Sequence, residues 1–187
     1  MIFFISDTHF GHQNVIRYTG RPFSSTEEMD ETLIANWNNT ISPTDQVYHL
    51  GDFSLAKKDY AKRILDRLNG QIFLVRGNHD HSDIRKLDRF AWVKDYYELK
   101  IPDEEMDLEQ HIVMCHYPIE SWNKRHHGSW HLHGPCHGSL PSPDWQARLD
   151  VGVDVHKFKP LSYDEVKALM TFKVFKPIDH HRESIRK

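Results

Sequence analysis

Residue types that bind metal ions recur at five places along this 187-residue chain, and each place directly follows a segment predicted to be a strand. The five places are Asp7-Thr8-His9, Gly51-Asp52, Gly77-Asn78-His79-Asp80, His116 and Gly134-Pro135-Cys136-His137. Carboxylate and amide oxygens and neutral imidazoles together suit divalent ions. Two such ions about 3.5–4 Å apart can hold a phosphoryl group between them. The residue types therefore favour phosphoester chemistry, with Asp52 as the anion that bridges the ions.

The segments that must position these residues alternate between predicted strands and predicted helices. Strands are predicted over Ile2 to Ser6, Gln46 to Leu50 and Gln71 to Val75. Two segments with helical spacing of apolar residues lie between them, about Ser25 to Asn39 and Ala61 to Leu68. This order predicts a parallel sheet covered by helices. Because the carboxyl ends of parallel strands meet at one edge of a sheet, we expect the motifs to converge there.

The second half of the chain is predicted to hold further strands and a final helix. The strands expected there are Trp92 to Ile101, His111 to Cys115, Trp130 to His133 and Ala147 to Val151. The helix is expected over Ser162 to Phe172, where Ser162 and Glu165 have the spacing of a capping box. We expect residues 1–187 to form one domain with a loosely docked tail from about residue 173.

The composition is that of an ordinary soluble protein without a strong charge bias. Hydrophobic residues make up 39% and charged residues 27%, and the formal net charge of -3 gives no global basic field for nucleic acid. Two cysteines cannot make a disulfide framework. No apolar run approaches the ~18 residues of a membrane span, and the apolar start is too short for a signal peptide. We therefore expect a cytoplasmic protein with no membrane partner.

The ordered motifs resemble the calcineurin-like metallophosphoesterase superfamily over roughly the first 140 residues, and the block around Asn78 is the most specific part. The segment His9 to His12 resembles its small bacterial and phage branch. The resemblance implies a four-layer α/β/β/α sandwich of two mixed sheets. It also implies a dinuclear centre and direct attack of metal-bound hydroxide on phosphorus. The two divalent ions would be manganese first, with iron, zinc, nickel or magnesium also possible.

The resemblance also implies a role for each motif residue. His79 would donate a proton to the leaving group and would not bind a metal. The first metal would be held by Asp7, His9, Asp52 and His137. The second metal would be held by Asp52, Asn78 and His116.

One position departs from the family pattern and leaves the second metal site a ligand short. The family motif has Gly-His-x-His, but this chain has Gly134-Pro135-Cys136-His137, and proline offers no side-chain ligand. His133 could fill the gap, and strand alternation slightly favours it because His133 and Pro135 would share a face. Cys136 could instead coordinate as a thiolate, which favours softer metals such as zinc. A water ligand could also complete the site, or the site could be weak and fill only with substrate.

Several further residues have a functional and a structural interpretation. His12 could contact the substrate phosphate or cap the following helix, and Arg76 is a candidate phosphate contact. Arg21 could bind phosphate, but an ion pair is favoured, and His49 is expected to belong to a strand. The segment Trp122 to His127 could stack and clamp a nucleotide, but a solvated loop is favoured.

The predicted function is metal-dependent hydrolysis of a phosphoester, more a phosphodiester than a monoester because a small chain leaves little room for a cap over the site. The substrate would be a nucleotide, a nucleic-acid end or a small metabolite diester. A phosphomonoesterase remains the alternative, as does a degenerate member that binds metal or nucleotide without turnover. A mononuclear zinc hydrolase using Cys136 is a third hypothesis. The oligomeric state is not defined by the sequence.

Overall fold

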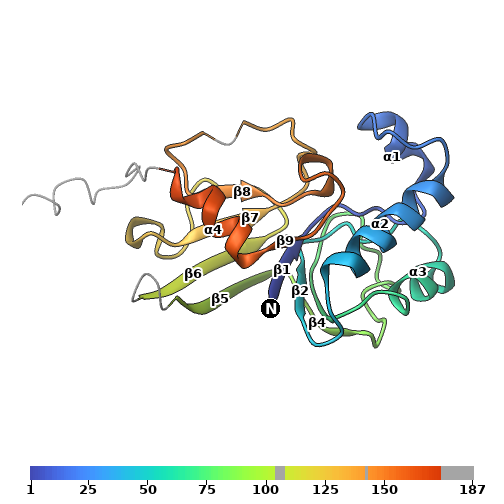
Figure 1. Ribbon diagram of the computed structural model, residues 1–187, viewed down its shortest axis with the longest axis horizontal. Coiled ribbons are helices and arrows are strands. Elements are labelled where there is room, and N and C mark those ends of the chain that lie inside the picture. The colour runs from blue at the N-terminus through green and yellow to red at the C-terminus, as the bar shows by residue number, and fades with distance from the viewer. Residues whose placement is uncertain (104–107, 142, 174–187) are drawn as a thin grey trace, which may run out of the picture.

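Two mixed β-sheets lie face to face in the computed structural model, which describes residues 1–103, 108–141 and 143–173 (Figure 1). Within these residues the first sheet has the strand order β4-β3-β2-β1-β9, and the second has the order β5-β6-β7-β8. The strands are β1 (Ile2–Ile5), β2 (Gln46–His49), β3 (Gln71–Val75), β4 (Phe90–Lys94), β5 (Tyr96–Asp103), β6 (Leu108–Cys115), β7 (Trp130–His133), β8 (Arg148–Asp150) and β9 (Leu161–Ser162).

Strands β1 to β4 run parallel to one another, as the alternation of strands and helices predicts. Strand β9 pairs antiparallel with β1. In the second sheet β5 and β6 are antiparallel, whereas β6, β7 and β8 are parallel. The carboxyl ends of β1, β2 and β3 therefore lie along one edge of the first sheet, and those of β6 and β7 lie along one edge of the second.

Helices cover the outer face of the first sheet (Figure 1). They are α1 (Gln13–Tyr18), α2 (Thr26–Thr40) and α3 (Lys58–Leu65). Helix α2 begins where the sequence predicts it, because the Ser25 side chain accepts a hydrogen bond from the Glu28 N–H at 3.1 Å. Its buried residues Met29, Leu33 and Trp37 belong to the apolar core on this face of the sheet.

A second apolar core fills the space between the two sheets. Phe4, Leu50 and Val75 contribute to it from the first sheet, and Met114 and Leu132 contribute from the second. All five side chains are almost completely buried. Strands β1, β2 and β3 thus contribute side chains to both cores, which accounts for the apolar character of Ile2 to Ser6.

Helix α4 (Tyr163–Thr171) packs against the second core. The predicted capping box of Ser162 and Glu165 is present at its start. The ring of Tyr163 stacks on Trp130 of β7 with ring centroids 6.0 Å apart. The predicted sandwich of two mixed sheets with flanking helices is confirmed. The loose tail expected from about residue 173 falls, from residue 174 on, outside the described residues.

The prediction of one strand over Trp92 to Ile101 was wrong. The chain forms two strands, β4 and β5, which belong to different sheets and are separated by Asp95. Asp95 forms an ion pair with Arg76 at 2.7 Å, and the Arg76 N–H donates to the Lys94 carbonyl at 2.7 Å. A continuous run of strand-forming residues carries no mark of the point where a chain crosses from one sheet to another.

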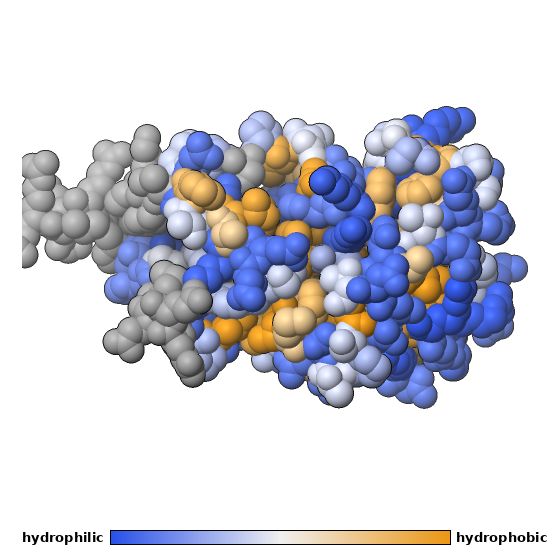
Figure 2. Space-filling view, in the orientation of Figure 1, coloured by the Kyte–Doolittle hydropathy of each residue, from blue (hydrophilic) through white to orange (hydrophobic). Residues whose placement is uncertain are grey.

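The face of the molecule shown in Figure 2 is mainly hydrophilic, and its apolar residues are divided among separate areas. Among the helices of the described residues, none combines the length and the apolar character needed to cross a bilayer.

Candidate metal centre

The five sequence motifs meet around the Asp52 carboxylate, between the ends of the two sheets. Asp52 Oδ2 lies 3.6 Å from His9 Nε2, 3.7 Å from His116 Nε2 and 3.9 Å from His79 Nε2. Asp7, His9, Asp52 and His116 are almost completely buried. The predicted convergence of residues more than one hundred positions apart in the chain is therefore present in the structure.

A first group of candidate ligands consists of Asp7, His9 and His137, whose ligand atoms all lie within 4.8 Å of one another. Asp7 Oδ1 and both ring nitrogens of His9 are buried and have no hydrogen-bond partner among the described residues. Burial raises the pKa of Asp7 well above its usual value, and burial lowers the pKa of His9 to about 2. Buried polar atoms without partners are costly, and a divalent ion would satisfy Asp7 Oδ1 and one ring nitrogen of His9.

A second group consists of Asp7, Asp52 and His116, again with ligand atoms within 4.8 Å of one another. The Nδ1–H of His116 faces the Leu50 carbonyl at 2.7 Å, so Nε2 of the neutral ring carries a lone pair. That nitrogen lies 3.0 Å from Asn78 Oδ1. Two acceptors that face each other need a cation or a donor between them, so this donor set also fits a divalent ion.

The backbone that carries these residues is held in an unusual conformation. Asp7, His9, Asp52 and His137 have positive φ angles of 59°, 51°, 56° and 46°, in the left-handed region. Such residues persist only where their surroundings hold them, and they cluster at functional sites. Here the Asp7 N–H donates to the Gly51 carbonyl and the His9 N–H donates to the Asp52 carbonyl, both at 3.0 Å. The loops after β1 and β2 thus support each other.

Two glycines are required because the ligand carboxylates lie directly against them. A Cβ atom on Gly77 would overlap Asp52 Oδ1, and one on Gly134 would overlap Asp7 Oδ2. The third and fifth motifs therefore carry glycine for a steric reason rather than for flexibility alone.

The Asp80 carboxylate joins the loop after β2 to the loop after β3. It accepts hydrogen bonds from the N–H groups of Asp52 at 2.9 Å, Phe53 at 2.8 Å and Gly77 at 2.8 Å. The His79 N–H in turn donates to Asp52 Oδ1 at 2.8 Å, which leaves Oδ2 for the centre of the site. The motif included Asp80, but the sequence did not indicate this role.

Asp154 orients His137 and was missed at the sequence level. His137 Nδ1 lies 2.7 Å from Asp154 Oδ2, and Arg21 binds both oxygens of the same carboxylate at 2.8 Å. Burial opposes ionisation of Asp154, but the bonds from His137 and Arg21 outweigh it and lower its pKa. A histidine held this way presents Nε2 as a ligand. Asp154 lies in an isolated turn, Val153–Val155, so no strand-end pattern marked it.

Arg21 forms an ion pair with Asp154. This confirms the role that we expected for Arg21 from the sequence in preference to phosphate binding. Its guanidinium also donates to the backbone carbonyls of Thr8 at 3.0 Å and Asp7 at 2.7 Å. His49 is likewise structural: its Nε2 lies 3.0 Å from Thr8 Oγ1, and burial lowers its pKa to about 3. Both side chains support the Asp7 to His9 loop.

His79 and His12 lie at the rim of the site. The His79 side chain is 46% exposed, and its ring centroid is 5.6 Å from that of His9. His12 occupies the residue before α1, but its side chain makes no capping hydrogen bond. Its ring centroid lies 5.5 Å from that of His9. Of the two roles weighed for His12, the helix cap is therefore not supported.

His133 and Cys136 are the two side chains that could fill the gap left by Pro135. His133 is buried, its Nδ1 lies 2.5 Å from the Gly134 carbonyl, and its Nε2 has no hydrogen-bond partner among the described residues, but it belongs to neither group of converging ligand atoms. Cys136 is in neither group, and burial raises the pKa of its thiol, which works against a thiolate. Asp7 belongs to both groups instead. The sequence did not indicate that this carboxylate reaches both positions.

Two further residues or segments considered from the sequence lie outside the ligand groups. Arg76 is half exposed and forms the ion pair with Asp95 beside the site. Trp122 and Arg125 are buried, and the guanidinium packs over the indole ring at 5.3 Å. The prediction of a solvated loop was therefore wrong for these two residues, because the loop turns its large side chains inward.

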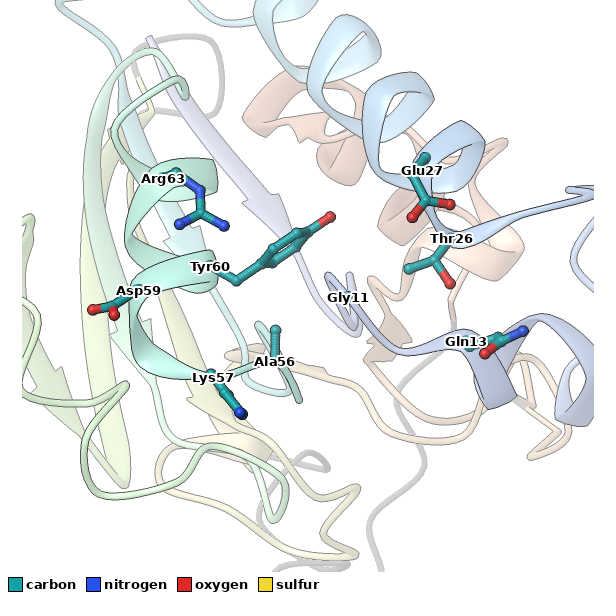
Figure 3. Close-up of a pocket in the computed structure, with 9 residues that line it drawn as sticks. All are labelled: Gly11, Gln13, Thr26, Glu27, Ala56, Lys57, Asp59, Tyr60 and Arg63. Carbon is teal, nitrogen blue, oxygen red and sulfur yellow. The ribbon is translucent and has the colours of Figure 1, made fainter.

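A separate pocket of about 470 Å³ lies between α2 and α3 (Figure 3). Tyr60 and Arg63 of α3 face Thr26 and Glu27 of α2 across it. None of the candidate metal ligands lines this pocket, so it is separate from the candidate metal centre.

Two facing mixed sheets with converging metal-binding side chains define a metallophosphoesterase fold, and the comparisons with known proteins agree. The family model for calcineurin-like phosphoesterases matches residues 1–156, and the chain belongs to this family. The chain is 37% identical over 177 residues to the uncharacterized protein MJ1445 of Methanocaldococcus jannaschii, with 90% of each protein covered. It also resembles the crystal structure of AQ665 from Aquifex aeolicus, a protein of unknown function, with 25% identity and a TM-score of 0.67. That match covers 90% of this chain and 98% of the other.

Proposed function

We propose that the chain hydrolyses phosphodiesters with the help of two divalent metal ions, manganese being the first ion to test. The observation that carries the proposal is the convergence of metal-binding atoms on the Asp52 carboxylate. Asp52 Oδ2 lies 3.6 Å from His9 Nε2 and 3.7 Å from His116 Nε2. Ions held there would bind the phosphoryl oxygens and lower the pKa of a water molecule. The first would be held by Asp7, His9, Asp52 and His137, and the second by Asp52, Asn78 and His116, with Asp7 in reach.

The side chains around the ions have separate tasks in this proposal. His79 stands at the rim, 46% exposed, where its ring can reach a leaving-group oxygen and give it a proton. Asp154 accepts from His137 Nδ1 and so keeps Nε2 turned to the site. Asp80 holds the two ligand loops in register through three backbone N–H groups. These contacts preorganise the site before substrate binds.

The open rim of the site supports the proposed preference for diesters. Asn78 and His79 are both exposed, so a substrate can extend away from the scissile phosphorus on this side. A monoesterase is the alternative within the same chemistry.

The test is a comparison of bis(p-nitrophenyl) phosphate with p-nitrophenyl phosphate after dialysis against chelator and reloading with manganese, zinc, nickel or magnesium. We expect two equivalents of bound metal and a higher kcat/KM for the diester. Faster hydrolysis of the monoester would overturn the diester preference while leaving the hydrolase proposal intact.

Pro135 favours one competing hypothesis, a member that binds metal or nucleotide without turnover, because it removes a side-chain ligand from the second site. One equivalent of metal and no hydrolysis of either substrate would support it. Retention of zinc through dialysis with no response to manganese would support a mononuclear zinc site at Cys136.

A further inference from the structure

A second pocket of about 380 Å³ adjoins the candidate metal centre on the side of Asn78. Asn78 and Gly77 line it, and Asn78 Oδ1 lies 3.0 Å from His116 Nε2. The same asparagine therefore forms part of the metal centre and part of the pocket wall. A substrate whose phosphorus lies at the metal centre can reach this pocket with its next few atoms.

The pocket wall includes an arginine with an unsatisfied donor. Arg85 lines it, and Arg85 Nε is buried with no hydrogen-bond partner within the part of the chain that the structure describes. The two carboxylates in the wall are already engaged. Asp80 accepts from three backbone N–H groups, and Asp95 pairs with Arg76 at 2.7 Å. A buried guanidinium N–H without an acceptor favours an anion from outside.

The wall of the pocket also offers a flat ring. Tyr117 is 50% exposed, and its ring meets the His116 ring edge to face with centroids 5.1 Å apart. This contact holds the phenol ring beside the metal centre. An exposed aromatic ring next to a cationic group is the arrangement that binds single-stranded nucleotides, because the base stacks and the phosphate pairs.

We propose that this pocket binds a second, non-scissile phosphate of a nucleotide substrate, with Arg85 as its main contact and Tyr117 as the stacking surface. The proposal rests on the proposed phosphoesterase function and narrows its substrate class to a nucleic-acid end, in which phosphodiesters follow one another. Arg85 is then a specificity-determining residue for the reaction, since it contacts substrate away from the bond that breaks.

The test uses two matched substrates, thymidine 5′-(p-nitrophenyl phosphate) with and without a 3′-phosphate. We expect kcat/KM to be about 10-fold higher with the 3′-phosphate, as a charge-assisted arginine contact would give. In Arg85→Gln the ratio of the two should fall to about 1, and Arg85→Lys should recover part of it. Lys86→Gln is the matched control, because Lys86 is exposed, carries the same charge and lies outside the pocket.

Binding of thymidine 3′,5′-bisphosphate and of thymidine 5′-monophosphate, measured by titration calorimetry, separates this proposal from the proposed function. Hydrolysis of both substrates with equal kcat/KM by the unaltered protein would overturn the pocket assignment and leave the phosphoesterase standing. Absence of hydrolysis, together with tighter binding of the bisphosphate that is lost in Arg85→Gln, would refute turnover and support the pocket. Equal affinity for the two nucleotides would overturn the pocket in either case.

Discussion

At the scale of single residues, the two oxygens of the Asp52 carboxylate have different tasks. Oδ1 accepts the His79 N–H at 2.8 Å, and Oδ2 faces the imidazoles of His9 and His116 at 3.6 Å and 3.7 Å. The backbone of Asp52 is itself in the left-handed region, with φ of 56°. The Asp52 side chain thus links the loop that carries His79, the proposed acid, to the atoms that would hold the two metal ions.

His79→Ala should lower kcat for diesters with poor leaving groups by about 10²- to 10⁴-fold, which is the range of general acid catalysis. The loss should be smaller with p-nitrophenol, because that leaving group departs without a proton. Metal content, measured by inductively coupled plasma spectrometry, should stay unchanged. His81→Ala, an exposed neighbour in the same loop, is the control. Equal losses for good and poor leaving groups would refute the role of acid.

Asp154→Asn should weaken metal binding at the first site by about 10- to 100-fold, because the charged partner of His137 is lost. Titration with Mn²⁺ followed by fluorescence of the tryptophans or by calorimetry measures the affinity. Asp164→Asn on the surface of α4 controls for the general loss of one negative charge. An unchanged Mn²⁺ affinity in Asp154→Asn would remove Asp154 from the set of positioning residues.

At the scale of elements, Asp30 of α2 connects three segments near the site. Its carboxylate accepts the Gly11 N–H at 3.0 Å and the Tyr60 hydroxyl of α3 at 2.8 Å. Burial raises its pKa to about 6, although the bonds from Tyr60 and Gly11 oppose the shift. The helices that cover the first sheet are thus fastened to the loop after β1 through a carboxylate that ionises with difficulty.

The contribution of Asp30 to the free energy of unfolding should therefore decrease as the pH rises from about 4 to 6. In this window the folded chain keeps the Asp30 proton while the unfolded chain, with a pKa near 3.9, has released it. Asp30→Asn should remove that part of the pH dependence. Urea unfolding at pH 4, 5, 6 and 7 measures it, with Asp59→Asn on the surface of α3 as the control. Parallel pH profiles for Asp30→Asn and the unaltered chain would contradict the assignment.

At the scale of the whole molecule, the candidate centre gathers carboxylates where the two sheets meet. Burial raises the pKa of Asp7, and repulsion from Asp52, Asp150 and Asp154 raises it further. Asp7 and Asp52 follow β1 and β2, whereas Asp150 ends β8 and Asp154 lies in the turn Val153–Val155. Without bound cations, the burial and mutual repulsion of these carboxylates destabilise the folded chain. Metal binding should therefore stabilise the packing of the two sheets.

Mn²⁺ at about 100 times its Kd should raise the free energy of unfolding by about 2.7 kcal/mol and Tm by roughly 5–10 °C. Chelation by EDTA should reverse the shift, as scanning calorimetry would show. Asp52→Asn should lose most of the shift and bind fewer metal equivalents, because the proposed bridge is gone. Asp66→Asn, exposed near the end of α3, is the control. The same Tm increase in Asp52→Asn would rule out a bridging role.

Much of the fold and of the candidate site could be predicted because both depend on local patterns. Strand β3 and strand β7 have the predicted bounds, and the capping residues Ser25 and Ser162 mark real helix starts. The ligand candidates stood directly after strands, and parallel strands bring their carboxyl ends together. Hydrophobic periodicity and helix capping each depend on a few neighbouring residues, so both can be recognised in the sequence.

The features that could not be predicted depend on which segments meet. Asp154 gives no local signal, yet it is the partner of both His137 and Arg21. The break at Asp95 became visible only when β4 and β5 were placed in different sheets. Arg85 Nε has no hydrogen-bond partner among the described residues because nearby carboxylates bind other groups, as Asp95 binds Arg76. The sequence does not show which residues lie around Arg85.

The sequence by itself determined the class of chemistry, the family resemblance and the alternation of strands and helices. The tertiary structure decided that Asp7 reaches both ligand groups, that His133 and Cys136 belong to neither, and that a pocket lined by Arg85 adjoins Asn78. The reason is physical: residue type and spacing state what a side chain can do. Tertiary packing decides which buried charges and unpaired polar atoms surround that side chain, and these neighbours decide which of its possible roles it can take.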